Sequence, residues 1–281
     1  MTVDSSGPLP LRGPLPLAGG QNAASIHQSH KLSQYCLFFL QFEKITQMIG
    51  EVINKLNREL PATVKLVAVS KFHPFEAIEE AYAAGQRCFA ESRPQELLAK
   101  VKRLEEIRAE RGEPDYMSDI EWHFIGHLQT NKLKMVLPYV SLVQSVDSLR
   151  LLEAIDRWGA ANGKVINVLL ECFISSDETK QGLSEQELTN ILSGDTVYAN
   201  VRICGLMGMA TFTDDEEVIR EDFQRLLDMQ TTLHDWIGES PNVRPGCNEL
   251  SMGMSDDYPI AVSMGSTIVR IGSMIFGERN Y

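Results

Sequence analysis

Short apolar runs alternate with amphipathic helical patterns along most of this chain, and this alternation constrains the fold more than any other feature. Between the runs, apolar residues recur at helical spacing, as they do over residues 97–107 and 223–237. Strands that alternate with helices pair in parallel, because a crossover helix joins each strand to the next. The eight runs are Val64–Ser70, Cys88–Glu91, Trp122–Ile125, Val140–Val146, Val165–Phe173, Val201–Met209, Glu249–Met252 and Thr267–Gly272.

The length of these units favours a closed barrel over an open sheet. About 220 residues hold the eight strand–helix units, which suits a (β/α)8 barrel. The alternative, a doubly wound open sheet, normally carries a G-x-G-x-x-G phosphate turn after its first strand, and this chain has none. Runs as continuous as Val165–Leu170 are typical of strands that are covered on both faces. The sequence therefore predicts a single (β/α)8 TIM barrel.

Residues 1–36 differ from the rest of the chain in composition. Repeated Pro-Leu steps and a polar Ser/Gln/His stretch bury little apolar surface, so we expect this N-terminal extension to be disordered. It lacks the apolar core of a signal peptide. A helix is expected to begin between Leu37 and Glu43 and to run to about Leu60. Residues 37–281 are then one domain, a barrel with an extra N-terminal helix.

The charge balance narrows the classes of partner. The chain carries 26 Lys and Arg residues against 38 Asp and Glu residues, a formal net charge of −12. Nucleic acids and anionic membranes bind basic surfaces, so neither is an expected partner. No apolar stretch is long enough to span a bilayer. A local basic pocket for a phosphorylated small molecule remains compatible with this charge.

The cysteines indicate a reducing compartment. All five are widely spaced and form no C-x-x-C pair, which argues against a disulfide framework and a structural zinc site. The six His residues form no H-E-x-x-H motif, and we expect His123 to pack as a strand residue rather than to bind metal. The prediction is a cytoplasmic monomer without a metal site.

Lys71 stands out among the polar residues at the ends of the predicted strands. Barrel enzymes place their sites at the carboxyl ends of the strands, and Lys71 directly follows the apolar run Val67–Ser70. A lysine that is desolvated in a barrel mouth can attack an aldehyde to form a Schiff base. Taken alone, Lys71 is better explained as a side chain that reaches solvent from a strand end.

Two segments rich in Gly and hydroxyl residues favour the Schiff-base interpretation of Lys71. Residues 249–255 and 265–273 adjoin the seventh and eighth strands, where barrels commonly bind phosphate through backbone N–H groups. Simple turn chemistry is the alternative explanation for both. A Schiff-base lysine that faces a phosphate site matches the two ends of pyridoxal phosphate, and Arg270 projects from the last strand, where it could reach the pyridine ring.

Several segments together resemble a known family. Residues 64–281 are similar to the YggS/PROSC family of pyridoxal phosphate homeostasis proteins, and the matching segments follow the family's order over the whole predicted barrel. These segments are Ala68–Lys71, His123–Lys132, Gly205–Met207, Leu250–Ser255, Gly265–Gly272 and Ile275–Arg279.

The resemblance implies a single barrel of the alanine racemase N-terminal domain type that holds pyridoxal 5'-phosphate as an aldimine with Lys71. It implies that Ser251, Gly272 and Ser273 hold the phosphate, with Thr267 as a weaker candidate. Arg270 is expected to face the pyridine nitrogen. Because a guanidinium donates but cannot accept a proton, that nitrogen stays unprotonated, and the ring is a poorer electron sink.

The chain departs from the family pattern at three places. Ala90 and Pro94 replace the usual Gly and Val in the run Phe89–Glu96, which leaves the loop after the second strand undefined, although Pro suits the first turn of a helix. Phe173 replaces a residue that is often Asn in the family. The N-terminal forty-odd residues have no counterpart, since family members begin near Met48. None of these departures touches Lys71 or the predicted phosphate site.

The choice between a carrier and a catalyst follows from the resemblance. Related racemases and decarboxylases carry a second, β-rich domain that supplies another catalytic group, and only nine residues follow Gly272 here. We therefore expect a cofactor carrier without turnover that exchanges pyridoxal phosphate reversibly with apo enzymes. The alternative is a pyridoxal-phosphate-dependent racemase or related enzyme that acts on small amino acids.

A third interpretation, a barrel hydrolase using Glu91 and Asp147, rests only on their strand-end positions.

Overall fold

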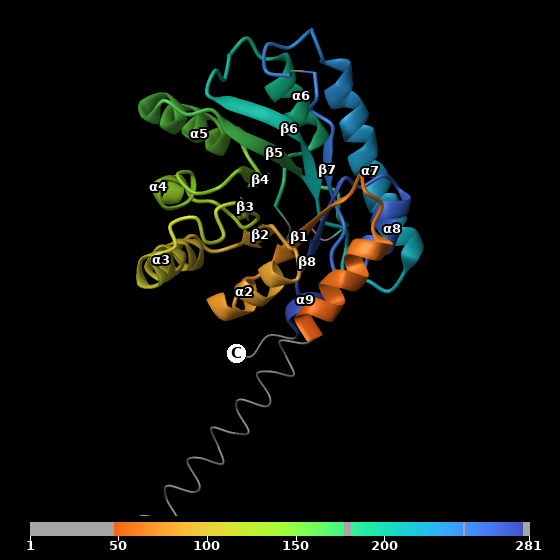
Figure 1. Cartoon of the computed structure of the whole chain (residues 1–281). Coiled ribbons are helices and arrows are strands. Elements are labelled where there is room, and N and C mark those ends of the chain that lie inside the picture. The colour runs from red at the N-terminus through yellow and green to blue at the C-terminus, as the bar shows by residue number, and fades with distance from the viewer. Residues whose placement is uncertain (1–47, 177–180, 244, 278–281) are drawn as a thin grey trace, which may run out of the picture. The chain divides into compact units, whose positions relative to one another are not determined.

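The eight strands form one closed parallel barrel whose strand order follows the chain (Figure 1). The structure is a computed structural model, and it describes residues 48–176, 181–243 and 245–277. The predicted TIM barrel is confirmed, and each predicted apolar run contains or overlaps one strand. The strands are β1 Lys65–Val69, β2 Cys88–Glu91, β3 Glu121–Phe124, β4 Leu142–Val146, β5 Ile166–Cys172, β6 Val201–Gly208, β7 Glu249–Ser251 and β8 Ile268–Ile271.

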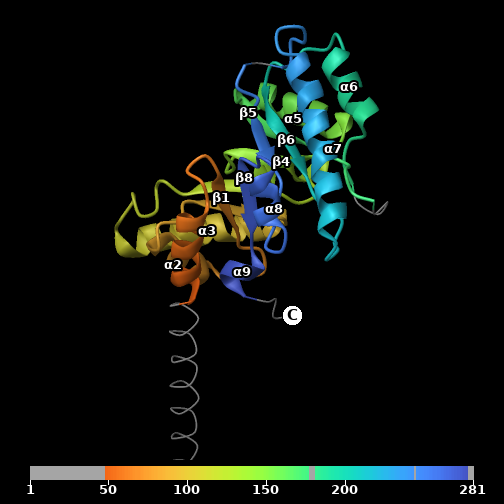
Figure 2. The same cartoon turned by 90° about the vertical axis from the view of Figure 1, so that its right-hand side faces the viewer.

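Helices surround the strands on the outside (Figures 1 and 2). Local signals explain their ends: Ser184 and Glu187 form a reciprocal capping box at the start of α6, and Gly112 and Gly163 take left-handed conformations after α3 and α5. Pro94 is the first residue of α3, as its restricted φ favours. The helices are α2 Phe75–Ala83, α3 Pro94–Arg111, α4 Leu133–Val136, α5 Leu149–Asn162, α6 Glu185–Ser193, α7 Glu216–Asp235, α8 Tyr258–Ser263 and α9 Ser273–Phe276.

A further helix precedes the barrel. Its described part covers residues 48–59, and Ile49, Ile53 and Leu56 are buried at the spacing of one helical face. Its end agrees with the predicted end near Leu60. Its predicted start and the extension over residues 1–36 lie outside the described residues. None of the helices within the described residues is both long and apolar enough to cross a membrane.

The strands are nearly continuous apolar runs because both of their faces are buried. Leu66 and Ala68 of β1 pack in the layer between the barrel and the helices, whereas Val67 and Val69 pack inside the barrel. The barrel interior also carries buried polar side chains, namely His123, Gln144, Glu171, Ser251 and Arg270. Since all strands are parallel, their carboxyl ends meet at one end of the barrel and bring distant residues together there.

Candidate active site at the carboxyl ends of the strands

A cavity of about 280 Å³ lies at the carboxyl ends of the strands and gathers four of the six predicted site residues. Lys71 follows β1, Arg270 belongs to β8, Gly272 follows β8 and Ser273 begins α9. The rest of the lining is largely apolar, with Ser255 from the loop after β7 as an added hydroxyl. Those apolar residues include Val69, Ile125, Met207, Met209, Phe212 and Met254.

Both chain neighbours of Lys71 are tied to β2 and α3. The Ser70 hydroxyl donates to Glu91 Oε1 over 2.6 Å, and the Ser70 carbonyl accepts from Lys100 Nζ over 2.7 Å. On the other side, Phe72 has a left-handed φ of 67°, and its N–H donates to Glu96 Oε2 over 2.9 Å. These bonds hold the turn that carries Lys71, so its side chain leaves the barrel wall at a defined place.

Lys100 and Glu91 form a buried ion pair behind this turn, and burying either charge without the other would be costly. Lys100 Nζ lies 2.5 Å from Glu91 Oε1, and both side chains are at least nine-tenths buried. Burial raises the pKa of Glu91, while the Lys100 ammonium acts in the opposite direction. Within the described part of the chain, Glu91 Oε2 has no hydrogen-bond partner. This geometry makes Glu91 an internal anchor beneath Lys71 and leaves it outside the cavity.

A chain of hydrogen bonds crosses the barrel interior and orients Arg270. Its Nη1 donates to Ser251 Oγ over 2.6 Å, and its Nη2 donates to the Gly208 carbonyl over 3.0 Å. Ser251 Oγ in turn donates to Gln144 Oε1 over 2.6 Å, and Gln144 Nε2 lies 2.8 Å from His123 Nδ1. Ser251 is fully buried and does not line the cavity. It contacts Arg270, so its effect on the cavity passes through that side chain.

Arg270 remains positively charged although it is only 3% exposed. Burial lowers its pKa to about 10, and the charges of Asp257 and Glu171 act against that change. A group with this pKa is protonated at neutral pH. Its guanidinium can therefore donate a hydrogen bond into the cavity but cannot accept one.

The end of β8 and the start of α9 form the rim of the cavity. A Cβ atom at Gly272 would lie 3.2 Å from the Val69 carbonyl oxygen, so the small residue lets β8 end close to β1. Ser273 Oγ and Ser255 Oγ are 3.0 Å apart, and the N–H of Met274 donates to Ser255 Oγ over 3.4 Å. Ser255 was not singled out from the sequence, although it lies in the Gly-rich segment that follows β7.

Thr267 lies at the opposite end of β8 from this cavity. It precedes the first residue of the strand, its Oγ1 donates to Glu249 Oε2 over 2.7 Å, and the same oxygen accepts from the N–H of Leu250 over 2.8 Å. These bonds join the amino ends of β7 and β8. Thr267 is not among the residues that line the cavity.

Acidic residues near the barrel mouth form a separate cluster. Asp147 Oδ2 lies 2.8 Å from His127 Nδ1, and both residues line another cavity, of about 510 Å³. Burial raises the pKa of Glu171 to about 7; Asp147 adds to this change, and Arg270 and His127 oppose it. Glu91 lines neither this cavity nor the cavity beside Lys71, so the two carboxylates of the hydrolase interpretation do not meet in either of these cavities.

Comparison with known proteins gives a consistent assignment. Residues 47–280 match the family described as "Alanine racemase, N-terminal domain". Proteins named pyridoxal phosphate homeostasis protein are 36% identical in Aquifex aeolicus, over 77% of this chain and 88% of the relative, and in Synechocystis, over 81% and 97%. The human protein of that name is also 36% identical, over 84% of this chain and 85% of the length of the human protein.

Solved structures agree with the fold. PipY of Synechococcus elongatus, described with pyridoxal phosphate bound, superposes with a TM-score of 0.69 at 33% identity, over 82% of this chain and all of PipY. Alanine racemase from Corynebacterium glutamicum is 14% identical with a TM-score of 0.56, and the match spans 60% of that enzyme, so it supports the fold alone. The chain therefore belongs to the alanine racemase N-terminal domain family and, within it, to the pyridoxal phosphate homeostasis proteins.

Proposed function

We propose that this protein binds pyridoxal 5'-phosphate at Lys71 and takes part in the intracellular homeostasis of that cofactor, without catalytic turnover. The observation that carries the proposal is the cavity that brings Lys71, Arg270, Gly272 and Ser273 together at the carboxyl ends of the strands. The names of the relatives and the pyridoxal phosphate bound to PipY support it.

The residues around the cavity fit the chemical groups of this cofactor. Pyridoxal phosphate supplies an aldehyde that condenses reversibly with a primary amine. Lys71 Nζ is the amine for that attachment, and the Arg270 guanidinium is the donor for the pyridine nitrogen. The hydroxyls of Ser273 and Ser255, with the backbone at Gly272, suit the phosphate oxygens. Ser251 contributes through Arg270, and Thr267 is not used as a direct contact.

The arrangement around Arg270 favours a carrier over a catalyst. Ser251 and Gly208 hold the guanidinium, so it keeps its donor toward the cavity and cannot deliver a proton as an acid of suitable pKa would. Ile125, Met207 and Met209 of the lining have no proton to exchange, and the titratable residues that line the cavity besides Lys71 and Arg270 are His73 and Asp256. In the proposed role, Lys71 captures free cofactor, limits its reactions with other amines and releases it to apo enzymes in the cytoplasm, with the protein acting as a monomer.

The test is an absorbance spectrum of the purified protein before and after borohydride reduction. We expect a visible band that borohydride bleaches, and a reduced label that peptide mass spectrometry maps to Lys71. Lys71→Ala should lose both, whereas Lys164→Ala, at an exposed lysine away from the cavity, should keep both. A wild-type protein that stays colourless after incubation with pyridoxal phosphate would contradict the proposal.

Carrier and catalyst are distinguished with the loaded protein. We expect no racemisation or transamination of alanine and other small amino acids, together with transfer of the cofactor to an apo enzyme, measured as recovered activity of that enzyme. Turnover that Lys71→Ala abolishes would favour the racemase alternative.

A further inference from the structure

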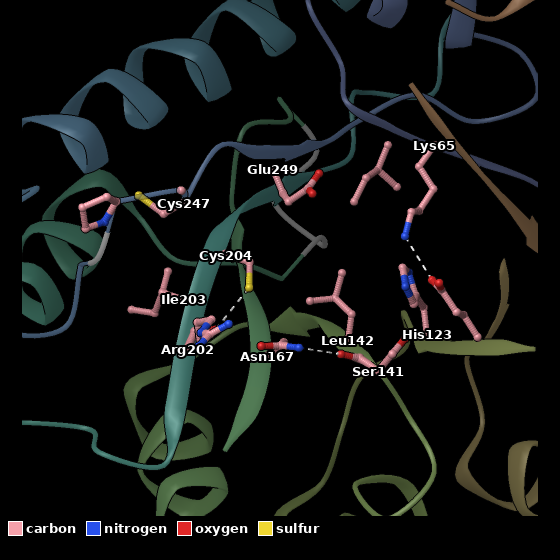
Figure 3. A pocket seen from close by; sticks show the side chains of 14 residues that line it. Lys65, His123, Ser141, Leu142, Asn167, Arg202, Ile203, Cys204, Cys247 and Glu249 are labelled. Atoms are coloured by element: carbon pink, nitrogen blue, oxygen red, sulfur yellow. Dashed lines mark hydrogen bonds and ion pairs between the residues drawn. The ribbon is translucent and has the colours of Figure 1, made fainter. Parts of the chain in front are cut away.

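A second cavity, of about 590 Å³ (Figure 3), is lined by residues at the opposite end of the barrel from the proposed cofactor site. Its lining includes Lys65, Glu121 and Glu249, which are the first residues of β1, β3 and β7. It therefore lies at the amino ends of the strands, whereas the proposed cofactor site lies at their carboxyl ends. None of the residues assigned to cofactor binding lines it.

Three potential metal ligands meet beside this cavity. The Cys88 sulfur, a carboxylate oxygen of Glu121 and a ring nitrogen of His123 all lie within 4.8 Å of one another. Cys88 pairs directly with Glu121 across β2 and β3, and His123 follows two residues later on the same face of β3. Cys88 and His123 are buried, while Glu121 is about half exposed. Strand register thus brings together side chains from two separate segments of the chain.

The ring of His123 has one nitrogen available for this cluster. Gln144 contacts Nδ1 at 2.8 Å, which leaves Nε2 as the nitrogen for a ligand. Metal-binding imidazoles usually have such a partner on the other ring nitrogen, because it holds the ring in one orientation. Gln144 provides that support from inside the barrel.

The positively charged side chain of Lys65 already lies beside the three ligands. Lys65 Nζ lies 3.0 Å from Glu121 Oε2, and its charge also acts on Cys88 and His123. Figure 3 shows Lys65 and His123 together on one side of the cavity, away from Cys247. The Lys65 side chain is 48% exposed, so it can turn out to solvent and leave room for another cation.

We propose that Cys88, Glu121 and His123 bind a zinc ion, with the cavity supplying the fourth position to a water molecule. Thiolate, imidazole and carboxylate are the donors that zinc takes in proteins, and three protein ligands with one open position are typical of zinc sites that are not purely structural. The site requires no cofactor at the other end of the barrel. It was not expected from the sequence, because the three residues form no local motif.

The proton balance of binding is defined. Cys88 loses its thiol proton to solvent as the Zn–S bond forms, and His123 binds through Nε2 as a neutral imidazole. The ring proton then lies on Nδ1, and the Gln144 amide turns so that its oxygen accepts it. Gln144 Nε2 then donates to Ser251 Oγ, which still accepts from Arg270, and the Ser251 hydroxyl gives up its hydrogen bond to Gln144 Oε1, so binding costs one buried hydrogen bond. Lys65 leaves Glu121 for solvent.

The first test is a titration of the full-length, metal-free protein with Co²⁺, followed by Zn²⁺. We expect a near-ultraviolet thiolate-to-cobalt absorption that zinc abolishes. Cys88→Ser should lose this absorption and weaken binding about tenfold or more. Cys204→Ser is the matched control, because Cys204 lines the same cavity outside the cluster, and it should keep the absorption. No absorption in the wild type, or an absorption that Cys88→Ser keeps, would overturn the proposal.

A second variant keeps the test decisive if Cys88→Ser does not fold. Lys65→Met removes the competing positive charge from a half-exposed side chain, so zinc affinity should rise about fivefold or more. A variant that binds zinc no better than the wild type would show that zinc does not use the Glu121 carboxylate. That result would exclude the proposed site.

Discussion

At the scale of single residues, the pair of Lys100 and Glu91 is the most sensitive point near the proposed cofactor site. Lys100→Met leaves the buried Glu91 carboxylate without its counter-charge, and we expect a loss of about 3 kcal/mol in the free energy of unfolding at neutral pH. The raised pKa of Glu91 rises further in this variant, so the loss should shrink as acid protonates the carboxyl. Urea denaturation at two pH values measures both effects.

The double variant separates a lost charge pair from lost packing. Glu91→Gln keeps a group that can accept the hydrogen bond from the Ser70 hydroxyl and removes the buried charge. Combined with Lys100→Met, it should recover most of the stability lost by Lys100→Met alone. A double variant that is as unstable as the sum of the two single variants would show that packing around α3, and not charge, is responsible.

At the scale of elements, a β-bulge in β6 shapes the wall of the second cavity. Val168 of β5 pairs with Ile203 and Leu169 pairs with Gly205, so Cys204 is the extra residue. Arg202, Ile203 and Cys204 all line the cavity, so this part of β6 forms a continuous stretch of its wall. Gly205 completes the bulge with a φ of 152° and no side chain.

Gly205→Ala is expected to break the contact between β6 and β7. Its Cβ would lie 1.9 Å from the Glu249 carbonyl oxygen, so the strands must separate, at a cost of about 3 kcal/mol or more. Gly163→Ala is the control, because Gly163 has a φ of 63° in open space and its substitution should cost only about 1–2 kcal/mol. Urea denaturation of both variants gives the comparison, and equal losses would mean that the clash is relieved without separating the strands.

At the scale of the whole molecule, the fold was more predictable than the details of the site. β2 spans the predicted run Cys88–Glu91, because a strand covered on both faces gives a continuous apolar signal. The stagger of the strands decides which inward-facing residues line a cavity, and this stagger cannot be predicted from the sequence. Ser251 therefore lies below the cavity, Thr267 at the far end and Ser255 on the rim. The register of β2 against β3, which brings Cys88 next to His123, is equally invisible in the sequence.

The barrel interior also makes the stability of the whole molecule depend on pH through Glu171. Its folded-state pKa is about 7, above its ordinary value of 4.5, because burial and Asp147 disfavour the charged form. A raised carboxyl pKa stabilises the fold below the ordinary pKa, and this contribution is lost as pH rises through about 7. Glu171→Gln removes the titration, so the stability of the variant relative to the wild type should rise by up to about 3 kcal/mol between about pH 4 and about pH 8.

Urea denaturation across this pH range measures the effect. Glu105→Gln, at an exposed glutamate on α3, is the control and should follow the wild-type profile. The Glu171 carboxylate raises the pKa of Arg270, so Glu171→Gln also removes a negative charge that favours the protonated guanidinium. If the difference in stability between Glu171→Gln and the wild type does not change with pH, Glu171 titrates at the same pH in the folded and unfolded chains, and the barrel interior tolerates its charge.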